Sequence, residues 1–138
     1  MILTRDKEIF QAVLDKFNVQ SSKYLIRRVP HNEVYRYLSA ADCAMLLRES
    51  CIVNRVASPT KFAEYINCSL PVLINNDIGD IDEINNKHNI CIYHEDVEVI
   101  RKKINEINSN KENFKLVVEN YFDWRKQINK IISIYRKL

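Results

Sequence analysis

Short apolar runs alternate with helical patterns along the whole chain. Five runs rich in Ile, Val, Leu and Tyr predict strands at residues 2–5, 24–29, 43–47, 71–74 and 90–93. Between them, apolar residues recur with the three- and four-residue spacing of helices that bury one face. Strands separated by helices predict right-handed βαβ units and a parallel sheet with helices on both faces. The predicted fold class is therefore α/β, with a Rossmann-like sheet.

Several predicted helices begin at a residue that can cap the N-terminus. Asp6 precedes a helix whose predicted buried stripe is Ile9, Phe10, Val13, Leu14 and Phe17. Ser58 and Pro59 supply a cap oxygen and then a proline at the first helical position. Asp80 and Glu83 have the spacing of a capping box. These signals set the expected helix starts.

The last third of the chain is helical and basic. Asp96 begins a helix with acidic residues in its first turn, and residues 111–138 predict two terminal helices. The net charge is +3, but residues 101–138 hold 10 basic and 4 acidic side chains. This surplus suits either peripheral contact with an anionic membrane or the solvated face of a helix. Neither reading involves nucleic acid.

Length and composition narrow the class of protein. A chain of 138 residues is expected to form one domain around one core. The single glycine, Gly79, excludes glycine-rich phosphate loops. The four cysteines lack the spacing of a zinc site or redox pair, so we expect reduced thiols and a cytoplasmic location. The N-terminus does not resemble a signal peptide, and no apolar run is long enough to cross a membrane.

The stretch after the third predicted strand has the features of an anion site. A polar loop that starts at Arg48 and Glu49 leaves the carboxyl end of the strand and enters a helix through Ser58, Thr60 and Lys61. Backbone N–H groups at a helix start, together with an ammonium group, favour a phosphate. Glu64 follows in the same helix, and its carboxylate can accept hydrogen bonds from a ribose diol. The stretch predicts a nucleotide site.

Each of these residues also has a structural interpretation. Glu64 and Lys61 can be ordinary surface residues of a helix, and Arg48 can simply pair with Glu49. His31, at the end of the second predicted strand, either faces a nucleobase or is a plain loop residue. The Asp80-Ile81-Asp82 sequence could hold a divalent metal, but the capping box explains it better, so no metal site is expected.

In these residues the sequence resembles the C-terminal, donor-binding domain of GT-B glycosyltransferases, closest to the bacterial family 4 enzymes that build capsular and surface polysaccharides. The resemblance covers nearly the whole chain and rests on segments that occur in the family's order. They are Pro30-His31-Asn32-Glu33-Val34 before a helix that ends at Ala40-Ala41-Asp42, Ala44-Met45-Leu46-Leu47-Arg48-Glu49, Ser58-Pro59-Thr60-Lys61-Phe62-Ala63-Glu64-Tyr65, Leu70-Pro71-Val72-Leu73 and Ile78-Gly79-Asp80. Phe122-Asp123-Trp124 and Tyr135 resemble the family's last helix, which crosses back toward the acceptor domain.

The resemblance implies a role for each candidate. The family's E-x7-E motif sets one glutamate beside the donor sugar and a second on the ribose. Glu64 matches the second, whereas the first position is Val56, for which Glu49 or Arg48 is the candidate replacement. Ser69 stands where the family usually has glycine before the next strand. The implied ligand is a nucleoside-diphosphate sugar, bound without metal or other cofactor and transferred to a polysaccharide or lipid-linked acceptor.

The resemblance also implies missing parts. The family's first strand, which would lie between the predicted strands at Ile2 and Cys43, has no counterpart here, and neither has the N-terminal acceptor domain. We therefore expect a gap or exposed strand edges, self-association and no sugar transfer by this chain alone. The alternative is a non-catalytic α/β module that binds a nucleotide or acts as a scaffold. A response-regulator receiver is a weaker rival, because the third predicted strand ends in Leu-Arg-Glu rather than in an aspartate.

Overall fold

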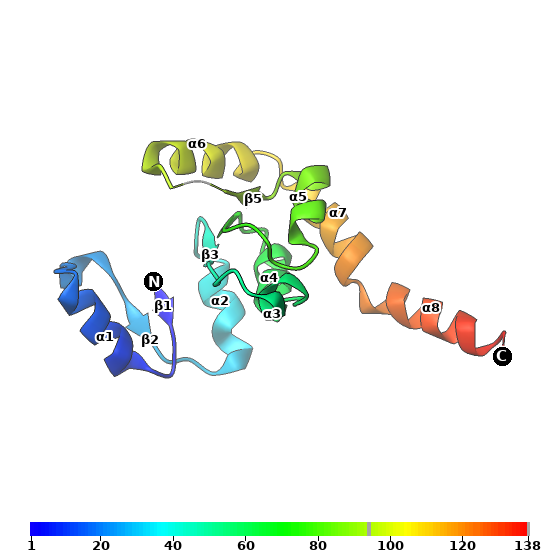
Figure 1. Ribbon diagram of the computed structural model, residues 1–138, viewed down its shortest axis with the longest axis horizontal. Helices are drawn as coiled ribbons and strands as arrows, with labels where there is room; N and C mark the ends of the chain where they lie inside the picture. The colour runs from blue at the N-terminus through cyan, green and yellow to red at the C-terminus, as the bar shows by residue number, and fades with distance from the viewer. Residues whose placement is uncertain (94, 138) are drawn as a thin grey trace. The chain divides into compact units, whose positions relative to one another are not determined.

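The computed structural model describes residues 1–93 and 95–137 (Figure 1). The chain divides into two compact units, Met1–Tyr37 and Leu38–Leu138. Every strand pair is parallel, in a two-stranded sheet β1-β2 and a three-stranded sheet β3-β4-β5. The α/β class and all five predicted strands are thus confirmed, but the strands form two sheets instead of one.

The N-terminal unit holds the smaller sheet. Its strands pair in the register Ile2 to Ile26, and the Ile2 N–H donates to the Leu25 carbonyl at 2.8 Å. The second unit begins within the last helix of this stretch. The elements in chain order are β1 (Ile2–Leu3), α1 (Lys7–Lys16), η1 (Ser21–Lys23), β2 (Ile26–Arg27), η2 (His31–Glu33) and α2 (Val34–Leu38).

The predicted buried stripe of α1 is wrong. Ile9 and Phe17 are 64% and 71% exposed, Phe10 and Val13 are also exposed, and Leu14 is partly exposed. The physical reason is the size of the sheet, since two strands of two residues each offer too little apolar surface to cover the helix. Asp6 does precede α1, as predicted, but its side chain makes no capping bond.

The C-terminal unit is built on the larger sheet. Ala44 pairs with Val72, and Val72 pairs with Cys91, so one register line crosses all three strands. Helices follow each strand, as the sequence pattern predicts. The elements are β3 (Ala44–Leu46), α3 (Ile52–Arg55), α4 (Thr60–Asn67), β4 (Val72–Ile74), α5 (Ile81–His88), β5 (Cys91–Ile92), α6 (Val97–Asn108), α7 (Glu112–Val117), η3 (Val118–Phe122) and α8 (Trp124–Tyr135).

The hydrophobic core lies in this C-terminal unit. Val72 at the centre of the sheet, Ile66 on α4 and Val117 on α7 are fully buried. The Phe62 and Phe122 rings meet edge to face with their centroids 6.1 Å apart, which joins α4 to η3. The core therefore fixes α4, whose first turn carries several of the predicted site residues.

The helix starts confirm one predicted boundary and correct two predicted caps. Helix α6 follows Asp96 as predicted, and the structure adds that the Asp96 carboxylate accepts from the backbone N–H groups of Glu98 and Val99. Pro59 rather than Ser58 is the residue before α4, so that start lies one residue further along. The capping box at α5 is wrong, because Glu83 pairs with Lys87 at 2.7 Å, one turn along the exposed helix face.

The four cysteines are free thiols, and burial raises the pKa of the Cys91 thiol. In the described part of the chain, no helix combines the length and apolar character that crossing a membrane requires.

Candidate functional site

The candidate site lies where β3 and β4 end. The chain leaves β3 at Leu46 into the segment that carries Arg48 and Glu49, passes through the short helix α3, and enters α4 after Pro59. The segment after β4 runs through Asn75 and Asp77 to Gly79. In open parallel sheets, ligands bind at this carboxyl edge.

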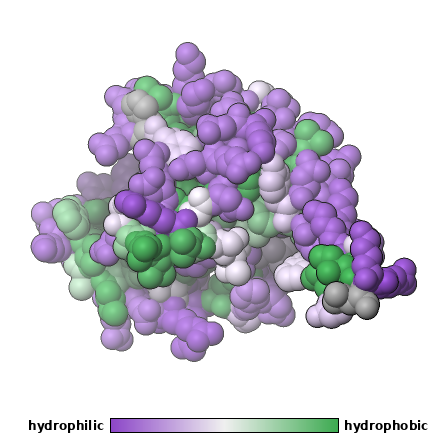
Figure 2. Space-filling model, turned by 45° about the vertical axis from the view of Figure 1, so that its right-hand side comes forward, coloured by the Kyte–Doolittle hydropathy of each residue, from purple (hydrophilic) through white to green (hydrophobic). Residues whose placement is uncertain are grey.

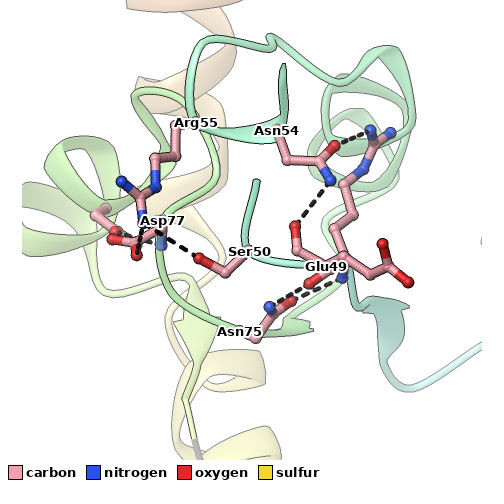
Figure 3. Close-up of polar contacts among 8 residues, drawn as sticks. Glu49, Ser50, Asn54, Arg55, Asn75 and Asp77 are labelled. Atoms are coloured by element: carbon pink, nitrogen blue, oxygen red, sulfur yellow. Dashed lines mark hydrogen bonds and ion pairs between the residues drawn. The ribbon is translucent and has the colours of Figure 1, made fainter. Parts of the chain in front are cut away.

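Asn75 holds the start of the polar loop against the end of β4. Its side-chain carbonyl accepts from the Arg48 backbone N–H at 2.8 Å, and its amide N–H donates to the Arg48 carbonyl at 2.5 Å (Figure 3). One side chain therefore satisfies both backbone groups of the residue, as a neighbouring strand would. The hydrogen-bonded pairing of β3 with β4 is in effect extended beyond their last paired residues.

Asn54 fastens the same loop from α3. Its side-chain oxygen accepts from the Arg48 guanidinium at 2.9 Å, and its amide nitrogen donates to the Glu49 carbonyl at 2.9 Å. Figure 3 shows Asn54 and Asn75 approaching the backbone at Glu49 from opposite sides. The loop is thus held at its carboxyl-edge position by two amide side chains.

At Gly79, the loop after β4 lies in close backbone contact with the loop before α4. Its backbone N–H donates to the Asn54 carbonyl at 3.1 Å, and its φ is +53°. A Cβ atom at this position would lie 2.1 Å from the Ala57 carbonyl oxygen. Only glycine allows both this backbone conformation and this approach. The one glycine of the chain is therefore a positioning residue of the candidate site.

A second group of polar contacts lies on the Asp77 side of the site. Arg55 reaches the Ser50 hydroxyl at 3.4 Å and the Asp77 carboxylate at 3.8 Å (Figure 3). The Asp82 carboxylate accepts from the Asp77 backbone N–H at 3.2 Å and from the Tyr93 hydroxyl at 2.5 Å. Burial and this hydrogen bond to a carboxylate raise the pKa of Tyr93. Asp82 is thus part of the internal bracing of the loop.

Two cations at this edge lack an acidic partner. In the described chain, no carboxylate lies within ion-pair distance of Arg48 or Lys61, although Arg48 is half-buried and hydrogen-bonded to Asn54. The first turn of α4 carries no acid, and Pro59 gives it no side-chain cap. A helix start with open N–H groups and nearby cations is a favourable place for an anion.

The other predicted residues are placed as follows. Ser58, Thr60 and Lys61 are exposed at the start of α4, and Glu64 is half-buried one turn later. Burial and the neighbouring Glu64 carboxylate raise the pKa of Tyr65. Arg48 does not pair with Glu49 within the described residues, since its guanidinium binds Asn54. His31 is exposed in η2 and belongs to the N-terminal unit, whereas the other candidates belong to the C-terminal one.

Sequence reasoning missed the residues that hold the loop. The sequence pattern singles out neither Asn75 and Asp77, which follow the fourth predicted strand, nor Asn54, which lies in the polar loop. The available signal was their place: asparagine after a buried parallel strand lies at the sheet edge where ligands and loops converge. Gly79 carried a stronger signal, since a single glycine in the chain marks a position that a side chain cannot occupy.

No three His, Cys, Asp or Glu side chains of the described residues gather as a metal-ion site. No protein-family model matches the chain, and no match was found among curated proteins or solved structures. The functional argument therefore rests on the residues and geometry described above.

Proposed function

We propose that this chain is the donor-binding part of a GT-B glycosyltransferase and binds a nucleoside-diphosphate sugar at the carboxyl ends of β3 and β4. Three observations carry the proposal. The loop after β3 is held by side-chain hydrogen bonds, the N-terminus of α4 has no side-chain cap, and Arg48 and Lys61 have no acidic partner in the described chain. Such a site suits the negative charge of a diphosphate.

The topology supports the finer fold assignment. β1 pairs with β2 in one sheet, and β3, β4 and β5 pair in that order in the other. Both sheets are parallel, as that fold requires.

Ser69 supports the same assignment from a local conformation. Its φ is +54°, in the left-handed region that glycine adopts most easily. The resembled family usually has glycine at this position. The residue type departs from the family pattern, but the backbone conformation is the one a glycine would serve.

Each candidate has a defined part in the proposed binding. The N–H groups at Thr60 and Lys61 and the Lys61 ammonium face the diphosphate, and they stabilise the charge that grows on it as the sugar departs. Glu64 accepts hydrogen bonds from the ribose hydroxyls. Arg48 or Glu49 contacts the sugar in place of the residue missing at Val56. The Ser58 hydroxyl adds a further donor for a phosphate oxygen.

Calorimetric titration of the chain with UDP and with GDP tests this proposal. We expect one of the two to bind, and Glu64→Ala to weaken its binding by about 1–3 kcal/mol, the contribution of hydrogen bonds to a charged group. Lys61→Gln should weaken it as well. Glu119→Ala, which removes an exposed glutamate from η3, is the matched control and should leave the affinity unchanged.

The results that contradict the proposal are equally concrete. Equal affinities of the original chain, Glu64→Ala and Lys61→Gln would exclude this edge as the nucleotide site. Absence of binding to either nucleotide in a chain with a cooperative unfolding transition would contradict donor binding itself.

One observation favours a second candidate, a non-catalytic α/β nucleotide-binding or scaffold module. Val56, at the position of the family's sugar-binding glutamate, is 79% exposed and offers no polar group to a sugar. A module of this kind would bind the nucleotide without recognising the sugar. Equal affinity for UDP and UDP-glucose, or for GDP and GDP-mannose, would support the module over the enzyme.

A further inference from the structure

The last helix, α8, presents an apolar face to solvent. None of its residues is buried. Figure 2 shows hydrophobic surface bordered by hydrophilic side chains at the lower right, on the side of the molecule where α8 lies. The exposed apolar side chains are Trp124, Ile128, Ile131, Ile132, Ile134 and Tyr135.

These side chains form one continuous stripe. Trp124, Ile128, Ile131 and Tyr135 are spaced by four, three and four residues, which is the spacing of one helix face. The ring side chains at its two ends, Trp124 and Tyr135, are 75% and 72% exposed. Trp and Tyr favour the boundary between apolar and aqueous surroundings.

The charged side chains of α8 and of the two residues that follow it are all basic. From residue 124 to residue 137 the chain has five cations and no acid. At 3.6 residues per turn, Arg125 and Arg136 fall on one border of the stripe, and Lys130 and Lys137 fall on the other, with Lys126 between them. Long basic side chains at such borders can extend to phosphate groups while the apolar stripe is buried.

Helix α1 also has an exposed apolar face, but its charged residues differ from those of α8. α1 also exposes apolar side chains, among them Ile9 and Val13, but it carries two basic and two acidic residues. A face with balanced charge suits another protein surface. A face bordered only by cations suits an anionic one.

We propose that α8 binds an anionic lipid bilayer and lies in the plane of its surface. Its 12 residues span about 18 Å, too short to cross a hydrocarbon core of about 30 Å, and its amphipathic pattern is that of an interfacial helix. The stripe inserts among the acyl chains near the headgroups, and the four cations at its borders contact lipid phosphates. This proposal does not depend on the nucleotide site.

The tryptophan makes the proposal directly measurable. Trp124 is the single tryptophan of the chain and stands in the stripe, so its fluorescence reports on α8 alone. We titrate the chain with vesicles of equal parts phosphatidylglycerol and phosphatidylcholine, and separately with phosphatidylcholine vesicles. We expect a blue shift with the anionic vesicles, weakened at high salt, and little change with the neutral ones. Brominated lipids should quench the emission.

Two pairs of variants test the two parts of the interaction. Removing two border charges, with Lys130→Gln and Lys137→Gln, should weaken vesicle binding about thirtyfold, at about fivefold for each charge. The same change at Lys102 and Lys111, which are exposed on α6 and before α7, is the matched control. Ile128→Ser with Ile131→Ser should weaken binding about tenfold or more, whereas Ile9→Ser with Val13→Ser on α1 should not.

Three results would overturn the proposal. One is no blue shift with anionic vesicles. Another is equal binding to neutral vesicles with no effect of salt. The third is a blue shift that grows with protein concentration in the absence of lipid, since this would show that the stripe binds a second copy of the chain instead.

Discussion

The Asn75 side chain forms hydrogen bonds with both backbone polar groups of Arg48, although the two residues are 27 positions apart in the sequence. The Asn75 side chain accepts from the Arg48 N–H and donates to the Arg48 carbonyl. The bonds set where the loop leaves β3, and so they set the position of the Arg48 guanidinium beside Asn54. An amide side chain at the end of one strand thus defines the candidate site at the end of the next.

Asn75→Ala should loosen this loop and lower the free energy of unfolding by about 1–3 kcal/mol, because both half-buried backbone groups of Arg48 would lose their partner. Urea unfolding measures the change. Asn76→Ala is the matched control, since the neighbouring asparagine is exposed and should tolerate the substitution. Equal stabilities of the two variants would show that the Asn75 bonds do not fasten the loop.

Gly79 and Ser69 form a complementary pair for testing backbone strain. Gly79→Ala should lower the free energy of unfolding by about 2 kcal/mol or more, since a side chain at a positive φ would also meet the Ala57 carbonyl. Ser69→Gly should have the opposite sign and stabilise by up to about 1 kcal/mol, because it relieves the left-handed conformation of a serine. Thermal and urea unfolding measure both. A destabilising effect of Ser69→Gly would show that the serine side chain contributes more than the strain costs.

The positions of the strands and of most helices were predictable because they depend on local patterns. The five apolar runs and the helix start at Asp96 are properties of a few neighbouring residues, and the structure confirms them. The division into two sheets and the exposure of α1 depend on how much apolar surface distant segments can offer. Periodicity in one segment does not contain that information.

The sequence predicts where the candidate site lies, but not the hydrogen bonds that hold it together. A polar loop after a strand and a helix that begins near Thr60 are visible in the sequence. The bonds that brace the loop are not, because Asn75 meets Arg48 only when β3 and β4 are already paired. The sequence suggests for Asp82 only a place in a possible metal site, Asp80-Ile81-Asp82, whereas its partner Tyr93 follows the next strand, 11 residues away.

Alkaline pH should destabilise the chain through Tyr93 and Cys91. Burial raises the pKa of both groups above their ordinary values of 10.0 and 9.0, and the Asp82 carboxylate raises them further. The unfolded chain therefore loses these protons at a lower pH than the folded chain, so stability is full below about pH 9 and falls as the pH rises.

The measurement is the free energy of unfolding in urea, under reducing conditions, from neutral pH to about pH 11. Tyr93→Phe should reduce the alkaline loss of stability, and Tyr35→Phe, which removes an exposed hydroxyl, is the control. Identical pH profiles of the original chain and Tyr93→Phe would contradict the role assigned to Tyr93.

Nucleotide binding should not require a divalent metal ion. In the proposed site, helix N–H groups and Lys61 meet the charge of the diphosphate, and Asp82 is engaged by Tyr93 and the Asp77 backbone. Calorimetric titration in the presence of EDTA should therefore give the same affinity as titration with Mg²⁺. Asp82→Asn should lower stability while sparing affinity. Loss of binding in EDTA, reproduced by Asp82→Asn, would replace this interpretation with a metal site that includes the Asp80-Ile81-Asp82 sequence.

This chain should transfer no sugar by itself, even when it binds the donor. A GT-B reaction takes place between two domains, and holding both reactants in register contributes roughly 7–11 kcal/mol to lowering the barrier. The described strands form two open sheets, in which β1, β2, β3 and β5 are all edge strands, so we expect self-association through unpaired backbone groups. Incubation with radiolabelled nucleotide sugars and lipid-linked acceptors tests transfer, and light scattering gives the mass in solution. Transfer by a stable monomer would contradict both the need for an acceptor domain and the argument from the open edges.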